Sequence, residues 1–423
     1  HVAGIFAEMS VMTRHLSTRR DLLLGSGALF AWASLPRLAR AEGRDPRMLV
    51  IVLRGALDGL ATVAPVGDPD WVRLRGDHAL RLDGTAPALA LNDMFALNPA
   101  MPNLHRLYKA KQAAIVHAVA TPYRERSHFD GQDVLESGFT RPGATDSGWL
   151  NRAMAALEPA KGIRVKPQQA FAVGPVTPLV VRGAAPVLSW TPPRLPPAAD
   201  DTVMRLLDLY RHTDPALARV MEERMGLAAI ARADGMSDMK KAAPLPGGAA
   251  RVAAFFAEAS GAAARFMAQA DGPRVGALAF DGWDTHAAEG VTQGRLFSLL
   301  GALDGAIAAV ETGMGPAWKD TAVAVVTEFG RTARVNGTDG TDHGTGTVAL
   351  LAGGALNGGR VIADWPGVGE TALYEKRDLK ATTDLRAVLK GLLHDHLRVE
   401  ETALAASVFP GSAAVKPMRE LVA

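Results

Sequence analysis

The sequence contains no cysteine among its 423 residues. Disulfide bonds and thiolate metal ligands are therefore excluded, so any metal site would have to use histidine and carboxylate groups. Aromatic residues are also few, at 6%, whereas hydrophobic residues make up 48% and charged residues 21% of the chain. This composition is typical of a globular protein with ample core, arranged as one large α/β domain or as two or three smaller ones.

Long uncharged apolar runs are also absent. The apolar stretch 22–35 is too short to span a bilayer, and no later segment is long and uncharged enough to do so. Arg19 and Arg20 precede this stretch, and a small-x-small sequence, "ARA", follows it at 39–41. The pattern resembles a twin-arginine export signal, although a basic tail before a short helix is the alternative.

The export signal sets the expected domain organisation and localisation. Residues 1–41 are predicted to be the signal and upstream residues, and 44–423 a single soluble domain. The twin-arginine translocation machinery is the partner expected during export, because this route carries proteins that are already folded. The mature protein is expected to be periplasmic or secreted, without a membrane span.

Neither sign of charge dominates the chain, which has 46 Lys and Arg, 44 Asp and Glu and a formal net charge of +2. Five of the basic and two of the acidic residues lie within 1–41, so the remainder carries a net charge of about −1. Nucleic-acid binding therefore loses its main electrostatic support and is not expected.

Apolar runs typical of strands alternate with helical patterns along the chain, which predicts an α/β fold. The expected architecture is a mostly parallel central sheet with helices on both faces. The clearest strands are 47–53, 112–120, 275–280, 321–327 and 346–354, and the clearest helices are 101–111, 128–138, 294–313 and 383–397. Residues 166–190 indicate short strands with Pro/Gly turns, and a helical insertion beside the sheet is expected at about 196–270.

Polar residues gather where these strands end or begin. Ligands of open parallel sheets bind beyond the carboxyl ends of strands, so these residues are expected to form one site. They are Asp58 after the first strand, Arg124, Arg126, Ser127, His128 and Asp130 after the second, Asp281, Asp284 and His286 at the end of the third, Glu328 and Arg331 after the fourth, and His343 before the fifth.

The residue types favour chemistry on a tetrahedral oxyanion. Aspartate and histidine suit divalent ions such as Zn²⁺ or Mn²⁺, which polarise phosphoryl or sulfuryl oxygens. Ser127 begins a helix between basic neighbours, so it is placed to face an anion. Arg331 or Arg124 could clamp a transferring oxyanion through its planar guanidinium.

Each of these residues also has a purely structural interpretation. Asp58 and Ser127 could be helix caps or turn residues. Glu328 and Arg331 could form an ion pair around a turn. His286 and His343 could be ordinary loop histidines, the latter in a Gly-rich turn.

Five segments in this order carry a resemblance to a known family: "LRGALDGL", "RSHFDGQDVLESG", "GWDTH", "TEFGRT" and "DHGTGTVALLAGGALNGG". Behind a twin-arginine signal they look like the DUF1501 family, which is grouped by fold with the alkaline phosphatase and sulfatase superfamily. The resemblance covers roughly 45–415. It implies an alkaline-phosphatase-like fold.

The resemblance also implies roles for individual residues. Ser127 resembles the superfamily's nucleophile. The residues that resemble its metal ligands are Asp58, Asp284, His286, Glu328 and His343.

The sequence departs from the superfamily in two places. The Asp–His dipeptide of the superfamily is here Glu328–Phe329, and Asp284 and His286 stand two residues apart instead of four. One divalent ion (Zn, Mn, Ca or Mg) is therefore expected in place of two, held by Asp284, His286 and His343 with Asp58 nearby. Trp283 is expected to pack beneath the loop.

These observations lead to one main hypothesis and two alternatives. The main hypothesis is an exported metal-dependent hydrolase that acts on a small phosphate or sulfate ester. The first alternative is a catalytically degenerate protein of the same fold that binds an anion or a cell-envelope glycan without turnover. The second is an accessory protein of assembly or secretion.

Overall fold

The computed structural model describes residues 28–34, 44–157, 168–172, 178–185, 187–189, 248–270 and 272–423. The chain divides into two compact units, and all of these residues belong to the unit formed by residues 27–190 and 245–423. The twin-arginine pair, the 39–41 site and residues 196–247 of the expected insertion lie outside the described residues.

Ten of the described strands form one mixed sheet, in the order β12-β6-β11-β10-β2-β9-β1-β7-β8 with β13 beside β6. Its strands are β1 Ala28–Ser34, β2 Arg47–Arg54, β6 Ala113–Ala120, β7 Gln168–Ala172, β8 Val187–Ser189, β9 Val275–Asp281, β10 Thr321–Thr327, β11 Thr347–Ala352, β12 Arg360–Ile362 and β13 Thr383–Asp384. A small second sheet joins β3 Val63–Ala64, β5 Ala96–Leu97 and β4 Leu89–Ala90.

The direction of the strands decides which loops share an edge. β2 runs parallel to both β10 and β9, while β11 is antiparallel to β10 and to β6. β6 therefore points the same way as β2, β9 and β10. As a result, the carboxyl ends of these four strands and the beginning of β11 lie at one edge.

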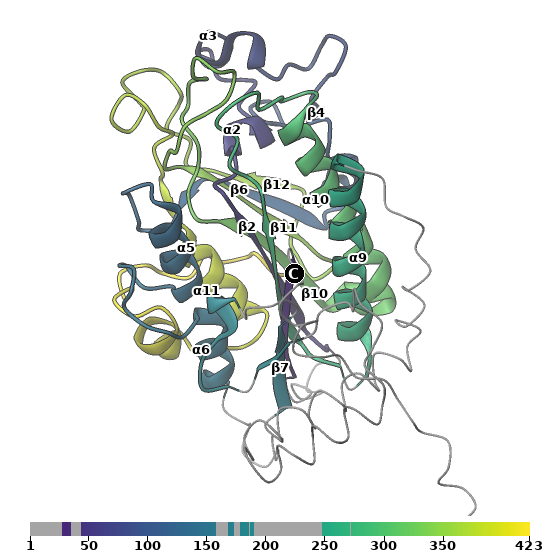
Figure 1. The fold of residues 1–423 in the computed structure, drawn as a ribbon. Helices are drawn as coiled ribbons and strands as arrows, with labels where there is room; N and C mark the ends of the chain where they lie inside the picture. Colours follow the sequence, from purple (N-terminus) through teal and green to yellow (C-terminus); the bar gives the residue numbers. More distant parts are fainter. Residues whose placement is uncertain are drawn as a thin grey trace, which may run out of the picture. The chain divides into compact units, whose positions relative to one another are not determined.

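Helices cover both faces of the sheet, as the sequence predicts. In Figure 1, α5, α6 and α11 lie on one side of the strands and α9 and α10 on the other. The helices are α2 Gly59–Thr62, α3 Trp71–Arg75, α4 Pro102–Lys109, α5 His128–Ser137, α6 Trp149–Ala156, α9 Ala249–Ala268, α10 Arg295–Met314, α11 Leu385–Asp395 and α12 Glu401–Ala403.

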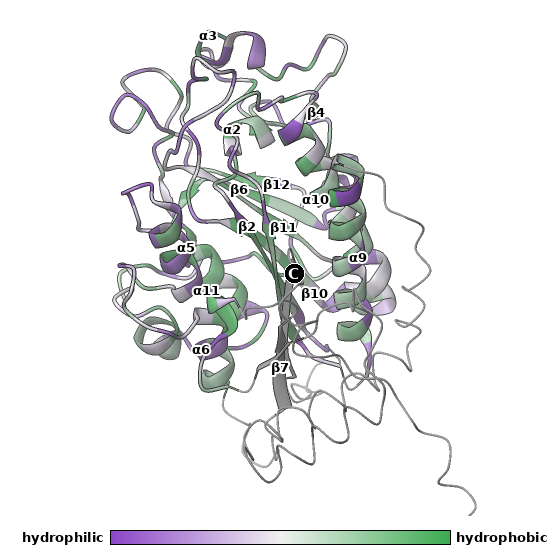
Figure 2. Ribbon diagram, in the orientation of Figure 1, coloured by the Kyte–Doolittle hydropathy of each residue, from purple (hydrophilic) through white to green (hydrophobic). Residues whose placement is uncertain are grey.

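The central strands are apolar on both faces. The residues of β2 from Arg47 to Leu53 and all seven residues of β10 are buried, and their Val, Ile and Leu side chains suit a strand that is covered by helices on either side. Figure 2 shows the hydrophobic strands between helices that carry hydrophilic residues on their outer sides. This core fixes the sheet and so the positions of its loops.

The five strands and four helices expected from the sequence are all present, with ends that differ by a few residues. The structure also places Ala28–Ser34 as β1, antiparallel to β9, inside the segment expected to be an export signal. Its uncharged apolar sequence, "ALFAWAS", suits pairing with an apolar strand as well as it suits a signal. At the end of the expected insertion, α9 packs against α10 as one of the helices that cover the sheet, and Phe256 stacks on Phe280 of β9.

Within the described residues, the segment Arg295–Asp320 is long and apolar enough to cross a membrane by length and composition. It comprises α10 and the 3-10 turn that follows it. Half of its apolar window is buried in the fold, where α10 packs on α9 and α4. This packing is that of a core helix.

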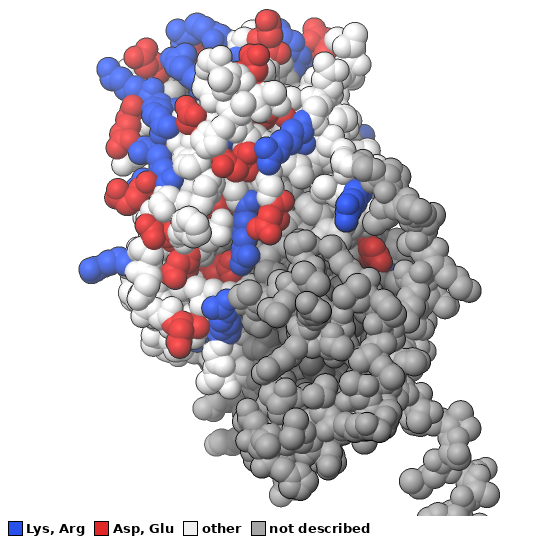
Figure 3. Space-filling model, in the orientation of Figure 1, with Lys and Arg blue, Asp and Glu red and all other residues white. Residues whose placement is uncertain are grey.

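Basic and acidic side chains are interspersed on the described part of the face shown in Figure 3. Neighbouring charges of opposite sign largely offset one another there. The near balance of charge in the sequence is thus also visible locally on this face.

Candidate metal site

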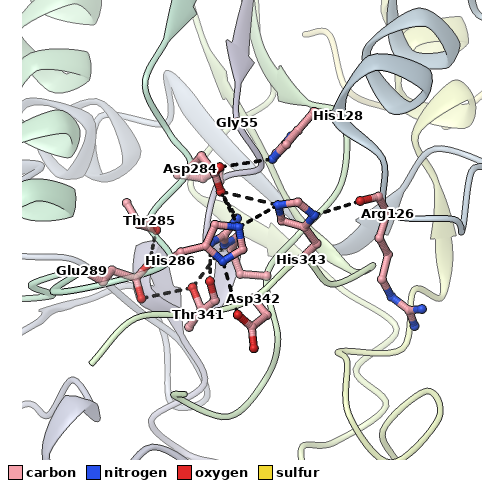
Figure 4. Close-up of polar contacts among 12 residues, drawn as sticks. Gly55, Arg126, His128, Asp284, Thr285, His286, Glu289, Thr341, Asp342 and His343 are labelled. Atoms are coloured by element: carbon pink, nitrogen blue, oxygen red, sulfur yellow. Dashed lines mark hydrogen bonds and ion pairs between the residues drawn. The ribbon is translucent and has the colours of Figure 1, made fainter. Parts of the chain in front are cut away.

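Loops from four strands meet at the edge where β2, β6, β9 and β10 end and β11 begins. His128 is the first residue of α5, which follows β6, whereas the loop after β9 supplies Asp284 and His286 and the loop before β11 supplies His343. Figure 4 shows these side chains pointing toward one another. The structure therefore brings together residues that are far apart in the sequence.

The orientation of the His128 ring is fixed by a carboxylate from the loop after β10. Its Nδ1 lies 2.9 Å from Oε1 of Glu328, a residue that is fully buried. The same oxygen accepts hydrogen bonds from the Gly55 amide at 2.8 Å and from Gln132 at 3.2 Å. Because an ionised carboxylate only accepts, Nδ1 of His128 must carry a proton, and in the neutral ring Nε2 is left with its lone pair.

The other two histidines are held in the same way. Nδ1 of His343 lies 2.9 Å from the carbonyl oxygen of Arg126, and Nδ1 of His286 lies 3.2 Å from Oδ1 of Asp342. Both partners are acceptors, so in each neutral ring Nδ1 is again the protonated nitrogen. All three imidazoles thus present Nε2 as a potential ligand.

These Nε2 atoms converge on the carboxylate of Asp284. Oδ1 of Asp284 lies 3.1 Å from Nε2 of His286 and 3.5 Å from Nε2 of His343, and its Oδ2 lies 3.6 Å from Nε2 of His128. The two Nε2 atoms of His286 and His343 are 2.9 Å apart. Ligand atoms of His128, Asp284 and His343 all lie within 4.8 Å of one another.

This arrangement fits a divalent metal ion. Two neutral imidazoles cannot face each other at 2.9 Å through lone pairs alone, so a cation or a proton is needed between them. Nε2 of His128 is buried and has no hydrogen-bond partner. In tetrahedral zinc sites neighbouring ligand atoms are about 3.3 Å apart, close to the spacing seen here. Three imidazoles and one carboxylate favour Zn²⁺ or Mn²⁺ over Ca²⁺ and Mg²⁺, which prefer oxygen ligands.

The Arg331 side chain completes the inner part of the site. It is 1% exposed, and its Nη1 donates to Oδ1 of Asp284 at 2.6 Å. Its Nε donates to the hydroxyl of Thr341 at 3.2 Å, and its Nη2 donates to the Thr341 carbonyl. All three guanidinium nitrogens of Arg331 therefore donate to Asp284 or Thr341. The sequence predicts instead that this guanidinium clamps an oxyanion.

The charged neighbours shift the pKa values of the cluster. The hydrogen bond to Glu328 raises the pKa of His128 above its usual value and outweighs the effect of burial. Burial, followed by the charge of His128, lowers the pKa of His343. Burial opposes ionisation of Asp284, but the hydrogen bond and the charge of Arg331, together with the charges of His286 and His128, lower its pKa overall. Without an ion, His128 therefore holds a proton more tightly than His343.

Asp58 does not join the cluster, although the sequence analysis expected it among the metal ligands. Both of its carboxylate oxygens accept from the buried guanidinium of Arg75, at 2.7 and 3.1 Å. Its Oδ1 also accepts from the amide of Ala61 and so caps α2. A metal at Asp58 would have to displace a buried ion pair, so the helix-cap interpretation is the correct one here.

Glu328, which the sequence suggests as a metal ligand, lies behind His128 and not among the converging ligand atoms. Burial opposes its ionisation, but the hydrogen bonds from His128 and from nearby donors lower its pKa overall, so it is a carboxylate. Glu328 contacts Nδ1 of His128, the nitrogen that points away from the cluster, so it orients the imidazole and would raise its basicity toward an ion. Phe329 stacks on the His128 ring, with centroids 5.1 Å apart.

Ser127 and Arg124 lie in the segment that joins β6 to α5. Ser127 is the N-cap residue of α5 and is half-buried, but its side chain makes no capping hydrogen bond. Its amide donates to the hydroxyl of Tyr123 at 3.2 Å, and its own hydroxyl lies beside the same phenol. Nη1 of Arg124, the other residue expected as an oxyanion clamp, donates to the carbonyls of Thr121 and Tyr123.

His128 was expected at this edge but not as a candidate ligand, and Asp342 was not expected to take part in the site. His128 follows Ser127 directly, and Asp342 precedes His343. The sequence could have indicated the role of His128, because His128, His286 and His343 are all histidines close to a strand end. Asp342 carries no comparable signal, since its role depends on where His286 lies.

The loop after β9 is held in place by contacts with the end of β2 and the loop that follows it. Trp283 is fully buried, as expected, and its amide donates to the carbonyl of Arg54 at 3.2 Å. Gly55 has φ +120°, and a Cβ there would lie only 2.5 Å from the amide nitrogen of Asp284. The β2 loop and the β9 loop can therefore touch only because residue 55 is glycine.

Comparison with known proteins yields a family but no relative of known activity. The chain matches the model of a family described as "Protein of unknown function (DUF1501)" over residues 45–407. No curated protein and no solved structure matches the chain. The match spans most of the sequence and includes every residue of the His–Asp cluster, so the chain belongs to the DUF1501 family.

Proposed function

We propose that this protein is a metal-dependent hydrolase of phosphate or sulfate esters. The observation that supports it best is the convergence of three Nε2 atoms on Asp284, each ring being held by an acceptor on its Nδ1. Ligating histidines in metalloenzymes are usually oriented in this way. His128, His343 and Asp284 would hold the ion, with His286 as a further ligand.

A divalent ion in this position would polarise an ester oxygen and favour ionisation of a hydroxyl nucleophile. Ser127 is proposed as that nucleophile because it directly precedes His128 at the start of α5. The N-terminus of this ten-residue helix favours a negatively charged group nearby. Glu328 would orient His128, and Arg331 would hold the carboxylate of Asp284.

Export through the twin-arginine route to the periplasm or beyond remains part of this proposal. A small anionic ester is the proposed substrate class. The expected absence of nucleic-acid binding also remains a prediction.

The test is metal analysis of the purified protein combined with turnover of generic aryl phosphates and aryl sulfates. One equivalent of zinc or manganese is expected in the wild type and should be lost in His128→Ala and His343→Ala, because each removes a converging Nε2 atom. Ser127→Ala should retain the metal but lose turnover by a factor of about 10³ or more.

His105→Ala is a matched control for these variants. His105 is a half-buried histidine on α4, outside the cluster, and its Nε2 lies 2.9 Å from the carbonyl oxygen of Ala90, so its loss should leave metal content and turnover unchanged. A wild-type protein that holds no metal and leaves both substrate classes intact would refute the hydrolase proposal.

One observation favours the alternative of an anion- or glycan-binding protein without turnover. The Arg331 guanidinium already lies 2.6 Å from Asp284, and Phe329 stands where the superfamily has a histidine ligand. A positive group is therefore present in the cluster without a metal. Binding of inorganic phosphate or sulfate with no turnover of the esters would support this alternative.

A further inference from the structure

Arg331 lies between two carboxylates, only one of which belongs to the proposed metal site. On one side its Nη1 contacts Asp284 directly. On the other side its Nε donates to the Thr341 hydroxyl at 3.2 Å, and that hydroxyl donates to Oε2 of Glu289 at 3.2 Å. Figure 4 shows Glu289 and Thr341 on the side of the cluster away from His128.

Glu289 is built into this position. Its side chain is buried at 1% exposure, and its Oε1 accepts from the Thr285 hydroxyl at 2.7 Å. The charged groups that act on it are Asp58, Arg75 and Arg331. Burial, followed by the charge of Asp58, raises the pKa of Glu289 to about 7, so its negative charge is present mainly above neutral pH.

The charges explain why a second carboxylate is needed. Arg331 and Asp284 neutralise each other when no ion is bound. A divalent ion on Asp284 would place a second positive charge close to a buried guanidinium, where like charges repel strongly because the surroundings screen them poorly. The unfavourable interaction would be reduced by a negative charge that balances Arg331 from its other side.

We propose that Glu289 supplies this balancing charge, acting as a positioning residue that lets Arg331 and a divalent ion share the carboxylate of Asp284. The inference rests on the proposed function, because it assumes that the cluster binds a metal. Glu289 does not touch the ion or the substrate. It acts through Thr341 and Arg331.

A double-mutant cycle on zinc affinity at pH 8 tests the proposal. Glu289→Gln keeps the shape of the side chain and removes its charge, so zinc should bind about tenfold more weakly. In the Arg331→Gln background the same substitution should change the affinity by less than about twofold, because the charge that needs balancing is gone. Equal losses in both backgrounds, or no loss in either, would overturn the inference.

Asp304→Asn serves as the matched control. Asp304 is also a buried carboxylate with a raised pKa, but it accepts hydrogen bonds from the first residues of α4. Its substitution should lower stability without changing zinc affinity. A weakening equal to that of Glu289→Gln would show that loss of any buried carboxylate has this effect, which would also overturn the inference.

The same cycle on the denaturation midpoint of the metal-free protein separates this inference from the proposed function. Non-additive midpoints are expected, because Glu289 and Arg331 interact through Thr341 whether or not zinc is present. A wild type that binds neither zinc nor manganese and turns over no ester, but gives a non-additive cycle, would refute the hydrolase proposal and still show that Glu289 and Arg331 interact. Additive midpoints would show that Glu289 and Arg331 do not interact, which would overturn the inference.

Discussion

At the scale of single residues, the site is defined by which nitrogen of each imidazole is occupied. Glu328 illustrates this best, because the sequence suggests a ligand and the structure shows a carboxylate behind His128. The next residue, Phe329, packs on the ring of His128.

The pH dependence of stability should reveal the raised pKa of Glu289. Its pKa is about 7 in the folded protein, against an ordinary value of 4.5. Between these two values the folded state binds more protons than the unfolded state, so the free energy of unfolding falls as the pH rises. The loss should amount to about 3 kcal/mol between pH 4.5 and 7 in the metal-free protein.

Chemical denaturation at a series of pH values measures this effect. Glu289→Gln should lack this component of the fall, while other ionisable groups should contribute alike to both proteins. A pH profile of Glu289→Gln that runs parallel to the wild type between pH 4.5 and 7 would contradict the prediction.

At the scale of the elements, much of the site could be predicted because it depends on a simple pattern. Apolar strand sequences end in polar loops, and parallel strands bring their carboxyl ends to one edge. Asp284, His286 and His343 were placed together on this basis, and the structure brings them within hydrogen-bonding distance. The direction of β11 also matters, since its antiparallel course puts His343 at this edge.

The remaining contacts could not be predicted because they depend on side chains that meet only in three dimensions. Asp58 is paired with Arg75, which lies on a short helix 17 residues later, and no local pattern announces that pair. Arg124 turns back onto its own loop. A strand-end position therefore indicates the neighbourhood of a polar residue, but not its partner.

The contact between the β2 and β9 loops gives a prediction at this scale. Gly55→Ala should displace the loop that carries Asp284 and His286, because the new Cβ would overlap the Asp284 backbone. We expect a loss of stability of at least about 2 kcal/mol and a strong loss of zinc binding. Thermal unfolding and zinc titration measure the two effects.

Gly84→Ala distinguishes crowding from backbone strain. Gly84 also has a positive φ, at +91°, but a Cβ there would meet no atom within 4 Å. Its substitution should cost some stability and leave zinc binding intact. Equal effects of the two substitutions on zinc binding would show that the close approach at residue 55 is unimportant.

At the scale of the whole molecule, metal binding should be coupled to folding. The unfolded chain cannot present the cluster, so an ion that binds only the folded state stabilises it in proportion to its free concentration. At one hundred times the dissociation constant, zinc should add about 2.7 kcal/mol to the free energy of unfolding.

Thermal unfolding with and without zinc tests the coupling, and a chelator should reverse the shift. The gain should disappear in His343→Ala and persist in His105→Ala. An unchanged melting temperature at saturating zinc would contradict the prediction.

His128 and His343 are each held by an acceptor from the segment that carries the other histidine. His128, at the start of α5, is held by Glu328, 200 positions later. The loop just before α5 in turn offers the Arg126 carbonyl to His343, 217 positions later. Neither loop can set its own imidazole without the other. A partly folded chain would therefore hold no competent ligand set, and zinc uptake would mark the last stage of maturation.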